Sequence, residues 1–291
     1  MDIRSKYIRF IDEALELAKL IPVYFSKFSN KIYTNHQHIT LLVLKQKLKV
    51  NYRDLIELLK ANPLICSLIK LERIPHHTTL VKFAKRIKLK LINLLLNHKK
   101  AKTAAIDSTG FELESKSFYF RCIKGDTLNP WRKTKRFMKL TIAVDTDEQI
   151  IMTHRIRRDN KYGQIEFRAM LKELNIDYIL ADAWYDCGDN RRCAFSRGVI
   201  PVIPLRNDMR SYGYLKQNKK INCDNYHQRS KVETVFSVIK RKYGSVLKSR
   251  SYVTQKIEII CKLIAYNIDR QVRSTCLFIL GFQQSFISNK H

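Results

Sequence analysis

Apolar side chains recur every three to four residues through the first third of the chain, which is the spacing of one face of an α-helix. The runs cover residues 7–21, 39–48 and 55–59. Pro63 ends the third run, because proline disfavours the helical conformation in the residue before it. Ile74-Pro-His-His-Thr-Thr79 then marks the start of a long helix from Leu80 to about His98. The pattern predicts an all-helical region over residues 1–98.

The last of these helices carries a basic face, formed by Lys82, Lys85, Arg86, Lys88 and Lys90. Short helices joined by tight turns, with a basic last helix, are typical of a helix-turn-helix-like DNA-binding region. A plain helical bundle with a solvated lysine face has the same periodicity. The pattern alone does not separate these two interpretations, although it slightly favours DNA binding.

From about residue 101 the pattern changes to short β-branched and aromatic runs that alternate with helical segments. Strands are expected at 103–106, 118–123, 137–144, 149–156, 178–181 and 199–204. Helices are expected at 164–174, 189–196, 226–243 and 254–270. This order predicts an α/β (α+β) domain with a mixed sheet over residues 101–272, followed by a C-terminal tail over 273–291.

Charge adds a partner to this picture. The chain has 55 Lys plus Arg against 26 Asp plus Glu, a formal net charge of +29. Such an excess repels itself in a compact fold unless an anion offsets it, so a polyanion such as nucleic acid is the expected partner. The simpler alternative is a basic protein without such a partner. Residues 206–250 concentrate the charge and predict a DNA-facing surface, or else a solvated lysine-rich loop.

Several classes of protein are excluded by what the sequence lacks. No stretch reaches the roughly 18 apolar residues of a membrane span, and the charged start does not resemble a signal peptide. Seven scattered cysteines without a CxxC pair argue against disulfides and a zinc site. No glycine-rich phosphate loop is present, so no nucleotide cofactor is expected. We therefore expect a cytoplasmic protein that does not bind membranes.

Three carboxylates are candidates for catalysis. Asp107 and Asp182 each follow a strand-like run, and Glu233 lies inside a later helix. Carboxylates at strand ends can meet at one edge of a sheet, where a packed helix can add a third oxygen ligand for divalent cations. Two such cations about 4 Å apart suit phosphodiester chemistry. The alternative is that each aspartate caps the turn that follows it.

The helix that contains Glu233 has a more specific pattern. At 100° per residue, its polar residues Tyr226, Arg229, Glu233 and Lys240 share an arc of about 60° beside an apolar stripe. An ordinary ion pair between Arg229 and Glu233 would contribute a few tenths of a kcal/mol. That pair does not explain the tyrosine and the lysine on the same arc. A carboxylate beside two cations is what a site for both metal and phosphate needs.

Tyr226-x2-Arg229-x3-Glu233-x6-Lys240 resembles the signature of DDE transposases from prokaryotic insertion sequences, in their fourth and fifth families. Other blocks are similar to the same family in the same order, and the resemblance spans about residues 35–270. The first-aspartate block is 105–110, the intervening strand 139–145, and the second-aspartate block 179–186.

The resemblance implies an RNase H-like catalytic domain in which Asp107, Asp182 and Glu233 hold two Mg²⁺ ions, with Mn²⁺ tolerated. The site would hydrolyse the bond at the element's end and then direct the freed 3′-hydroxyl onto target DNA. Trp184, beside the second aspartate, is expected to be a core or shielding residue rather than one that stacks on a base.

The resemblance also implies partners. Tyr226, Arg229 and Lys240 would contact phosphates around the scissile bond. The substrate would be double-stranded DNA, both the terminal repeats and the target, bound by a homodimer on paired ends at the nucleoid. Two alternatives stay open: an inactive or repurposed DNA-end-binding protein, and an RNase H-like nuclease that does not join strands.

Overall fold

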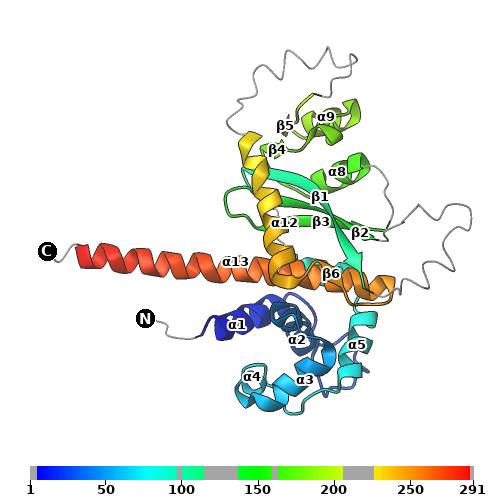
Figure 1. The fold of residues 1–291 in the computed structure, drawn as a ribbon, viewed down its shortest axis with the longest axis vertical. Helices are drawn as coiled ribbons and strands as arrows, with labels where there is room; N and C mark the ends of the chain where they lie inside the picture. Colours follow the sequence, from blue (N-terminus) through cyan, green and yellow to red (C-terminus); the bar gives the residue numbers. More distant parts are fainter. Residues whose placement is uncertain (1–4, 97–99, 115–136, 159–162, 206–225, 289–291) are drawn as a thin grey trace, which may run out of the picture. The chain divides into compact units, whose positions relative to one another are not determined.

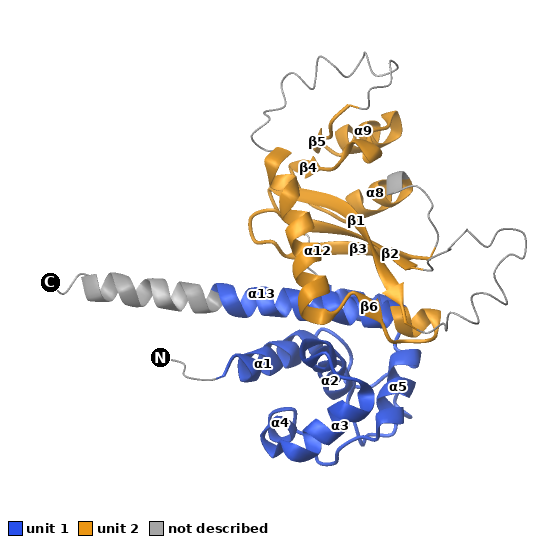
Figure 2. Ribbon diagram, viewed as in Figure 1, with its two compact units in different colours: residues 1–96, 256–291 blue, residues 97–255 orange. Residues whose placement is uncertain are grey.

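The computed structural model describes residues 5–96, 100–114, 137–158, 163–205 and 226–288, without the side chains of 163–164 and 275–288 (Figure 1). The chain forms two compact units, residues 1–96 with 256–291 and residues 97–255 (Figure 2). The expected strand at 118–123 and the 206–225 part of the basic segment lie outside the described residues. Across the described part of the chain, no helix has both the length and the apolar composition of a membrane span.

The first unit is helical. Its elements are α1 (Lys6–Ala18), α2 (Asn35–Leu48), α3 (Tyr52–Ala61), α4 (Pro63–Leu68), α5 (His77–Arg86), α6 (Leu89–Asn93), η1 (Leu94–Leu96) and most of α13 (Tyr252–Ser288). A capping box between Thr34 and Gln37 begins α2, and the Asn51 side chain caps α3. The single long helix expected from Leu80 to His98 is wrong. Ile87 has an extended backbone (φ −61°, ψ 128°) and a buried side chain, so α5 ends there and α6 is separate.

The α13 helix belongs largely to this unit, and this division differs from the boundaries predicted at residues 98 and 272. Most of α2 is buried, including its side chains from His38 to Gln46, as expected for a helix enclosed by its neighbours. The Lys47 ammonium pairs with the Asp269 carboxylate of α13. Lys45 lies over the Tyr52 ring, 4.7 Å from its centroid. The first contact joins α13 to α2, which is far from it in the sequence, and the second joins α2 to α3.

The second unit is built on one mixed sheet in the order β3-β2-β1-β4-β5, and β6 also pairs with β1. The strands are β1 (Thr103–Leu113), β2 (Phe137–Asp145), β3 (Ile151–Arg157), β4 (Tyr178–Leu180), β5 (Ile200–Val202) and β6 (Val246–Leu247). The first three pair antiparallel, whereas β4 and β6 run parallel to β1 and β5 runs parallel to β4. This is the topology of an RNase H-like sheet, and the predicted fold class is confirmed.

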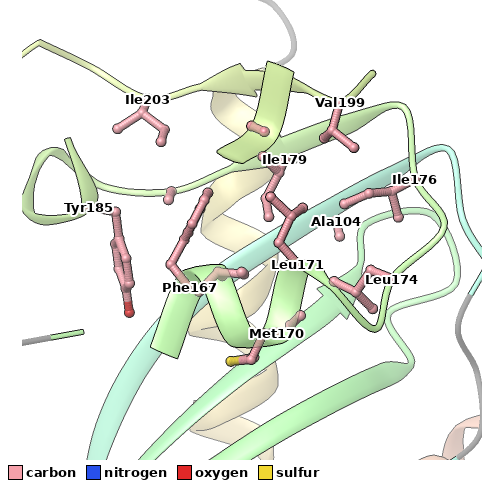
Figure 3. Packing of buried hydrophobic residues seen from close by; sticks show 14 of the residues in the cluster. Ala104, Phe167, Met170, Leu171, Leu174, Ile176, Ile179, Tyr185, Val199 and Ile203 are labelled. Atoms are coloured by element: carbon pink, nitrogen blue, oxygen red, sulfur yellow. The ribbon is translucent and has the colours of Figure 1, made fainter. Parts of the chain in front are cut away.

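Helices lie on the sheet, with α8 in front of the strands and α12 behind them in the view of Figure 3. The bounds of the added elements are α8 (Gly163–Leu171), η2 (Ala183–Tyr185), α9 (Gly188–Phe195), η4 (His227–Arg229) and α12 (Ser230–Tyr243). A buried cluster joins Ala104 and Ile106 of β1 to Phe167 of α8 and Ala194 of α9. Side chains alternate along a strand, so the residue between Ala104 and Ile106 and the residue after Ile106 face the other side of the sheet.

Candidate active site

Asp107 lies within β1 rather than at its end. The prediction that the strand stops at this residue is wrong, because β2 pairs with β1 from Ala104↔Asp145 to Glu112↔Phe137 and keeps the strand extended. Ala104 and Ile106 face the cluster beneath α8, so alternation turns Asp107 to the opposite face. An Oδ2 atom 3.7 Å from the Arg229 guanidinium agrees with this orientation.

Asp182 follows β4 at the matching position. The parallel pairing of β1 and β4 ends at Ala105↔Leu180, so the same register places Asp182 opposite Asp107, two residues further on. The Oδ1 atom of Asp182 accepts a hydrogen bond from the Trp184 N–H at 3.0 Å and caps η2. Asp182 therefore does cap a turn, as the alternative interpretation held, and does so beside the first aspartate.

Glu233 lies in the first turn of α12, one helical turn beyond Arg229. The Arg229 Nη2 atom donates to Glu233 Oε1 at 2.7 Å, and its Nη1 atom is 3.7 Å from Asp107 Oδ2. The expected ion pair is therefore present, but the same guanidinium also reaches the first aspartate. Arg229 thus bridges two of the three candidate carboxylates.

The charges of the three carboxylates interact. Burial raises the pKa of Asp107 above its usual value, and the negative charges of Asp182 and Glu233 raise it further. A hydrogen bond from the Ser108 N–H to Asp107 Oδ1 at 2.7 Å and the charge of Arg229 oppose these effects. The site thus gathers more negative charge than one arginine neutralises.

This donor set suits a hard divalent cation, because carboxylate oxygens are the ligands that Mg²⁺ prefers. Within the described residues, however, no three His, Cys, Asp or Glu side chains are arranged to hold a metal ion. Between Asp107 and Glu233 the positive group is the guanidinium of Arg229. The carboxylate donors fit a divalent cation. In this structure Arg229 neutralises part of the negative charge that such a cation would neutralise.

The other candidates lie along the same helix. Tyr226 precedes η4, and its ring centroid is 5.9 Å from Arg229 Cζ. Lys240 lies nearly two turns after Glu233, and its Nζ atom is 5.8 Å from the ring centroid of Phe111 on β1. Trp184 does not have the core position expected for it, because 66% of its surface is exposed.

A polar network on the sheet face opposite Asp107 was not identified from the sequence. Ser108 and Tyr185 join it from the two aspartate blocks, and Glu166 joins it from α8. The adjacency of Ser108 to Asp107 is a signal that could have indicated the serine. Glu166 sits in an ordinary amphipathic segment, and only the fold brings it to the sheet.

Comparison with known proteins adds two findings. Residues 98–268 match the family described as the transposase DDE domain. A similar solved structure is the piggyBac transposase in a synaptic complex with hairpin DNA, determined by cryo-EM, at 12% sequence identity and a TM-score of 0.49. That match covers 92% of this chain and 74% of the other. No curated protein sequence matches the chain.

Proposed function

Because this chain belongs to the DDE transposase family and is a DNA transposase, we propose that Asp107, Asp182 and Glu233 are its catalytic triad. The observation that supports the proposal is that β1 and the turn after β4 carry the two aspartates at matching positions, while Arg229 contacts both Asp107 and the Glu233 of α12. The strand register supports the first two, and the bridging Arg229 supports the third.

The three carboxylates would hold two divalent cations, with Mg²⁺ expected and Mn²⁺ as a substitute. When bound, these ions would lower the pKa of the attacking water and stabilise the leaving oxygen. The chain's own cations bind the DNA around the scissile bond. The planar guanidinium of Arg229 matches two phosphate oxygens, while Lys240 and the Tyr226 hydroxyl contact neighbouring phosphates.

The reaction has two steps at one site. Hydrolysis at the element's end frees a 3′-hydroxyl. This hydroxyl then attacks a phosphodiester of the target, and the transesterification breaks one phosphodiester bond as it forms another. The substrate is double-stranded DNA from the terminal repeats of an insertion sequence, held by a homodimer in the cytoplasm at the nucleoid.

The helical unit supplies a second contact with DNA. The basic side chains of α5 and the residues after it are exposed, which suits contact with the phosphate backbone. These residues are Lys82, Lys85, Arg86, Lys88 and Lys90. Phosphate contacts of this kind supply affinity and position, and they weaken steeply with salt.

The test is a cleavage and joining assay on duplexes that carry the DNA flanking the gene, with Mg²⁺, with Mn²⁺ and with EDTA. Wild-type protein should nick the element end and give a joined product in either metal, and EDTA should abolish both. Asp107→Asn, Asp182→Asn and Glu233→Gln should each abolish nicking while DNA affinity, measured by fluorescence anisotropy, stays unchanged.

Three results would overturn the proposal in different ways. Cut ends without a joined product would identify a nuclease rather than a strand-transfer enzyme. Binding without cleavage in either metal would identify an inactive end-binding protein. Cleavage by one of the three variants would remove that residue from the triad.

A further inference from the structure

A row of hydrogen bonds, buried at Glu166 and partly buried at Ser108, crosses the second unit on the face of the sheet opposite Asp107. The Oε2 atom of Glu166 accepts a hydrogen bond from the Thr141 hydroxyl. Thr141 Oγ1 is 2.8 Å from Ser108 Oγ, and Ser108 Oγ is 2.8 Å from the Tyr185 hydroxyl. The row therefore runs from α8, through β2 and β1, to the turn that carries Asp182.

The direction of these hydrogen bonds follows from counting protons. A carboxylate only accepts, so the single hydroxyl proton of Thr141 is committed to Glu166. Ser108 must then donate to Thr141, and Tyr185 must donate to Ser108. All three hydroxyl groups are consequently oriented by the charge of one carboxylate.

The row connects β1 to the segment after β4, where the backbones of the two are no longer hydrogen-bonded to each other. Hydrogen-bonded pairing of β1 with β4 ends at Ala105↔Leu180, two residues before each catalytic aspartate. Beyond that point the hydrogen bond between Ser108 and Tyr185 links the two segments through side chains. Ser108 is the neighbour of Asp107, and Tyr185 lies three residues after Asp182, so the link joins the two segments close to both carboxylates.

Packing holds the tyrosine in place at its other end. Its ring centroid is 5.8 Å from that of Phe167, and Figure 3 shows the tyrosine at the edge of the buried cluster beside this phenylalanine. The Asn190 side chain donates to the Tyr185 carbonyl oxygen at 2.9 Å. The hydroxyl group therefore has little freedom to find another partner.

Burying the charge of Glu166 costs desolvation free energy, so a role in stabilising the fold does not by itself explain a glutamate at this position. Its side chain is 1% exposed, and it is neutralised by Arg157 Nε at 3.0 Å and Lys139 Nζ at 3.4 Å. The Lys139 and Arg157 side chains are 16% and 34% exposed, so these pairs are buried only on the carboxylate side. A buried charge loses its hydration, so such pairs contribute little net stability. A buried carboxylate that orients three hydroxyl groups next to the active site points to a role in the site's geometry.

We propose that the row ending in Glu166 fixes the separation of Asp107 and Asp182 that the divalent cations require. Ser108, Tyr185 and Glu166 are positioning residues that act through the two aspartates. The inference rests on the proposed triad and deepens it, because it assigns the support of the metal ligands to residues outside the family signature of α12. Partners of metal ligands commonly change metal affinity or activity 10- to 100-fold when they are removed.

The experiment uses the full-length protein with Mn²⁺ as the probe. Tyr185→Phe keeps the packed ring and deletes the donor, whereas Ser108→Ala deletes the middle of the row. The matched control is Tyr178→Phe on β4, whose hydroxyl makes no hydrogen bond to any residue that the structure describes. Mn²⁺ binding is measured directly by electron paramagnetic resonance, and metal-free thermal unfolding and DNA affinity are measured in parallel.

We expect Tyr185→Phe and Ser108→Ala each to weaken Mn²⁺ binding about tenfold. The Mn²⁺ concentration that gives half-maximal cleavage should rise by the same factor. The double variant should be no weaker than either single one, since both changes break one link. Glu166→Gln should give a smaller loss, because an amide oxygen still accepts from Thr141. Tyr178→Phe and the DNA affinities should be unchanged.

Wild-type Mn²⁺ affinity in both single variants would overturn the inference, as would a hundredfold loss in the double variant or an equal loss in Tyr178→Phe. If wild-type protein binds Mn²⁺ but does not cut DNA, the proposed activity fails, and the binding data alone still decide the positioning role. If wild-type protein binds no Mn²⁺, both proposals fall.

Discussion

Replacing Glu233 by Gln separates catalysis from stability. The substitution keeps the shape of the side chain and one oxygen that can accept from Arg229, but it removes the negative charge. The proposed role of Glu233 as a metal ligand predicts that nicking and joining are abolished. The structure predicts that folding is almost unaffected.

The size of the stability change follows from the ion pair that is lost. The Arg229–Glu233 pair is 2.7 Å long, and its side chains are 22% and 54% exposed. Pairs of this spacing at a helix surface contribute about 0.2–0.5 kcal/mol, and solvent screens them. For a unit of this size, a loss of about 0.5 kcal/mol lowers the midpoint of thermal unfolding by no more than about 2 °C.

The matched control is Glu173→Gln. Glu173 pairs with Arg155 at the same distance, 2.7 Å, with side chains 40% and 27% exposed, and it lies outside the proposed triad. It also accepts a hydrogen bond from the Thr153 hydroxyl, which a glutamine oxygen can still accept. Thermal unfolding by circular dichroism and nicking of a labelled element end are measured for both variants. Both should unfold within about 2 °C of wild type, and only Glu233→Gln should lose nicking.

Two results would refute this reasoning. A fall in the unfolding midpoint of Glu233→Gln well beyond that of Glu173→Gln would show that the fold depends on the glutamate. Nicking at the wild-type rate by Glu233→Gln would show that its charge is not needed for the chemistry.

Other variants test the charges of Asp107, His154 and Asp269. Burial and neighbouring carboxylates raise the pKa of Asp107, so its ionised form opposes folding without metal, and Asp107→Asn should raise the metal-free unfolding midpoint measured by calorimetry. Burial lowers the pKa of His154 from 6.5 to about 4, so the unfolded chain binds the extra proton between these values. His154 should therefore lower the stability by about 2 kcal/mol from pH 7.5 to pH 5 in urea titrations, and His154→Leu should remove that share. A loss from His38, whose pKa burial also lowers to about 4, should remain in the variant. The Lys47–Asp269 ion pair is nearly buried, and Asp269→Asn leaves the Lys47 ammonium without its counter-charge. That variant should lose about 3 kcal/mol of unfolding free energy in urea titrations, whereas Lys47→Met combined with Asp269→Leu should lose less.

Much of the fold follows from periodicity. The strand expected at 137–144 is observed as Phe137–Asp145, and the helix expected at 189–196 as Gly188–Phe195. The resemblance to DDE transposases is confirmed by the family match. The strand has one strong apolar run with a polar residue at its end, whereas the helix is mostly polar and begins with an acidic first turn.

The failures depend on contacts between distant residues. The polar run Asp107-Ser-Thr-Gly110 suggests the end of a strand, but pairing with β2 extends β1 to Leu113. The bridging of two carboxylates by Arg229 depends on how α12 packs on β1, which a helical wheel does not contain. The proposed triad was predicted from the sequence, whereas the row that ends in Glu166 depends on tertiary packing.

The neighbours Asp107 and Ser108 point to opposite faces of one strand, and this makes the site sensitive to deletions. Removing or adding a single residue before Asp107 would exchange the two faces, sending the carboxylate toward the apolar cluster and the hydroxyl toward α12. Because β1 is central and is paired with β2 along most of its length, such a slip would break many hydrogen bonds at once. A copy of this gene with a one-codon deletion in β1 would therefore lose its chemistry more surely than a copy with a similar deletion at the outer strands β3 or β5.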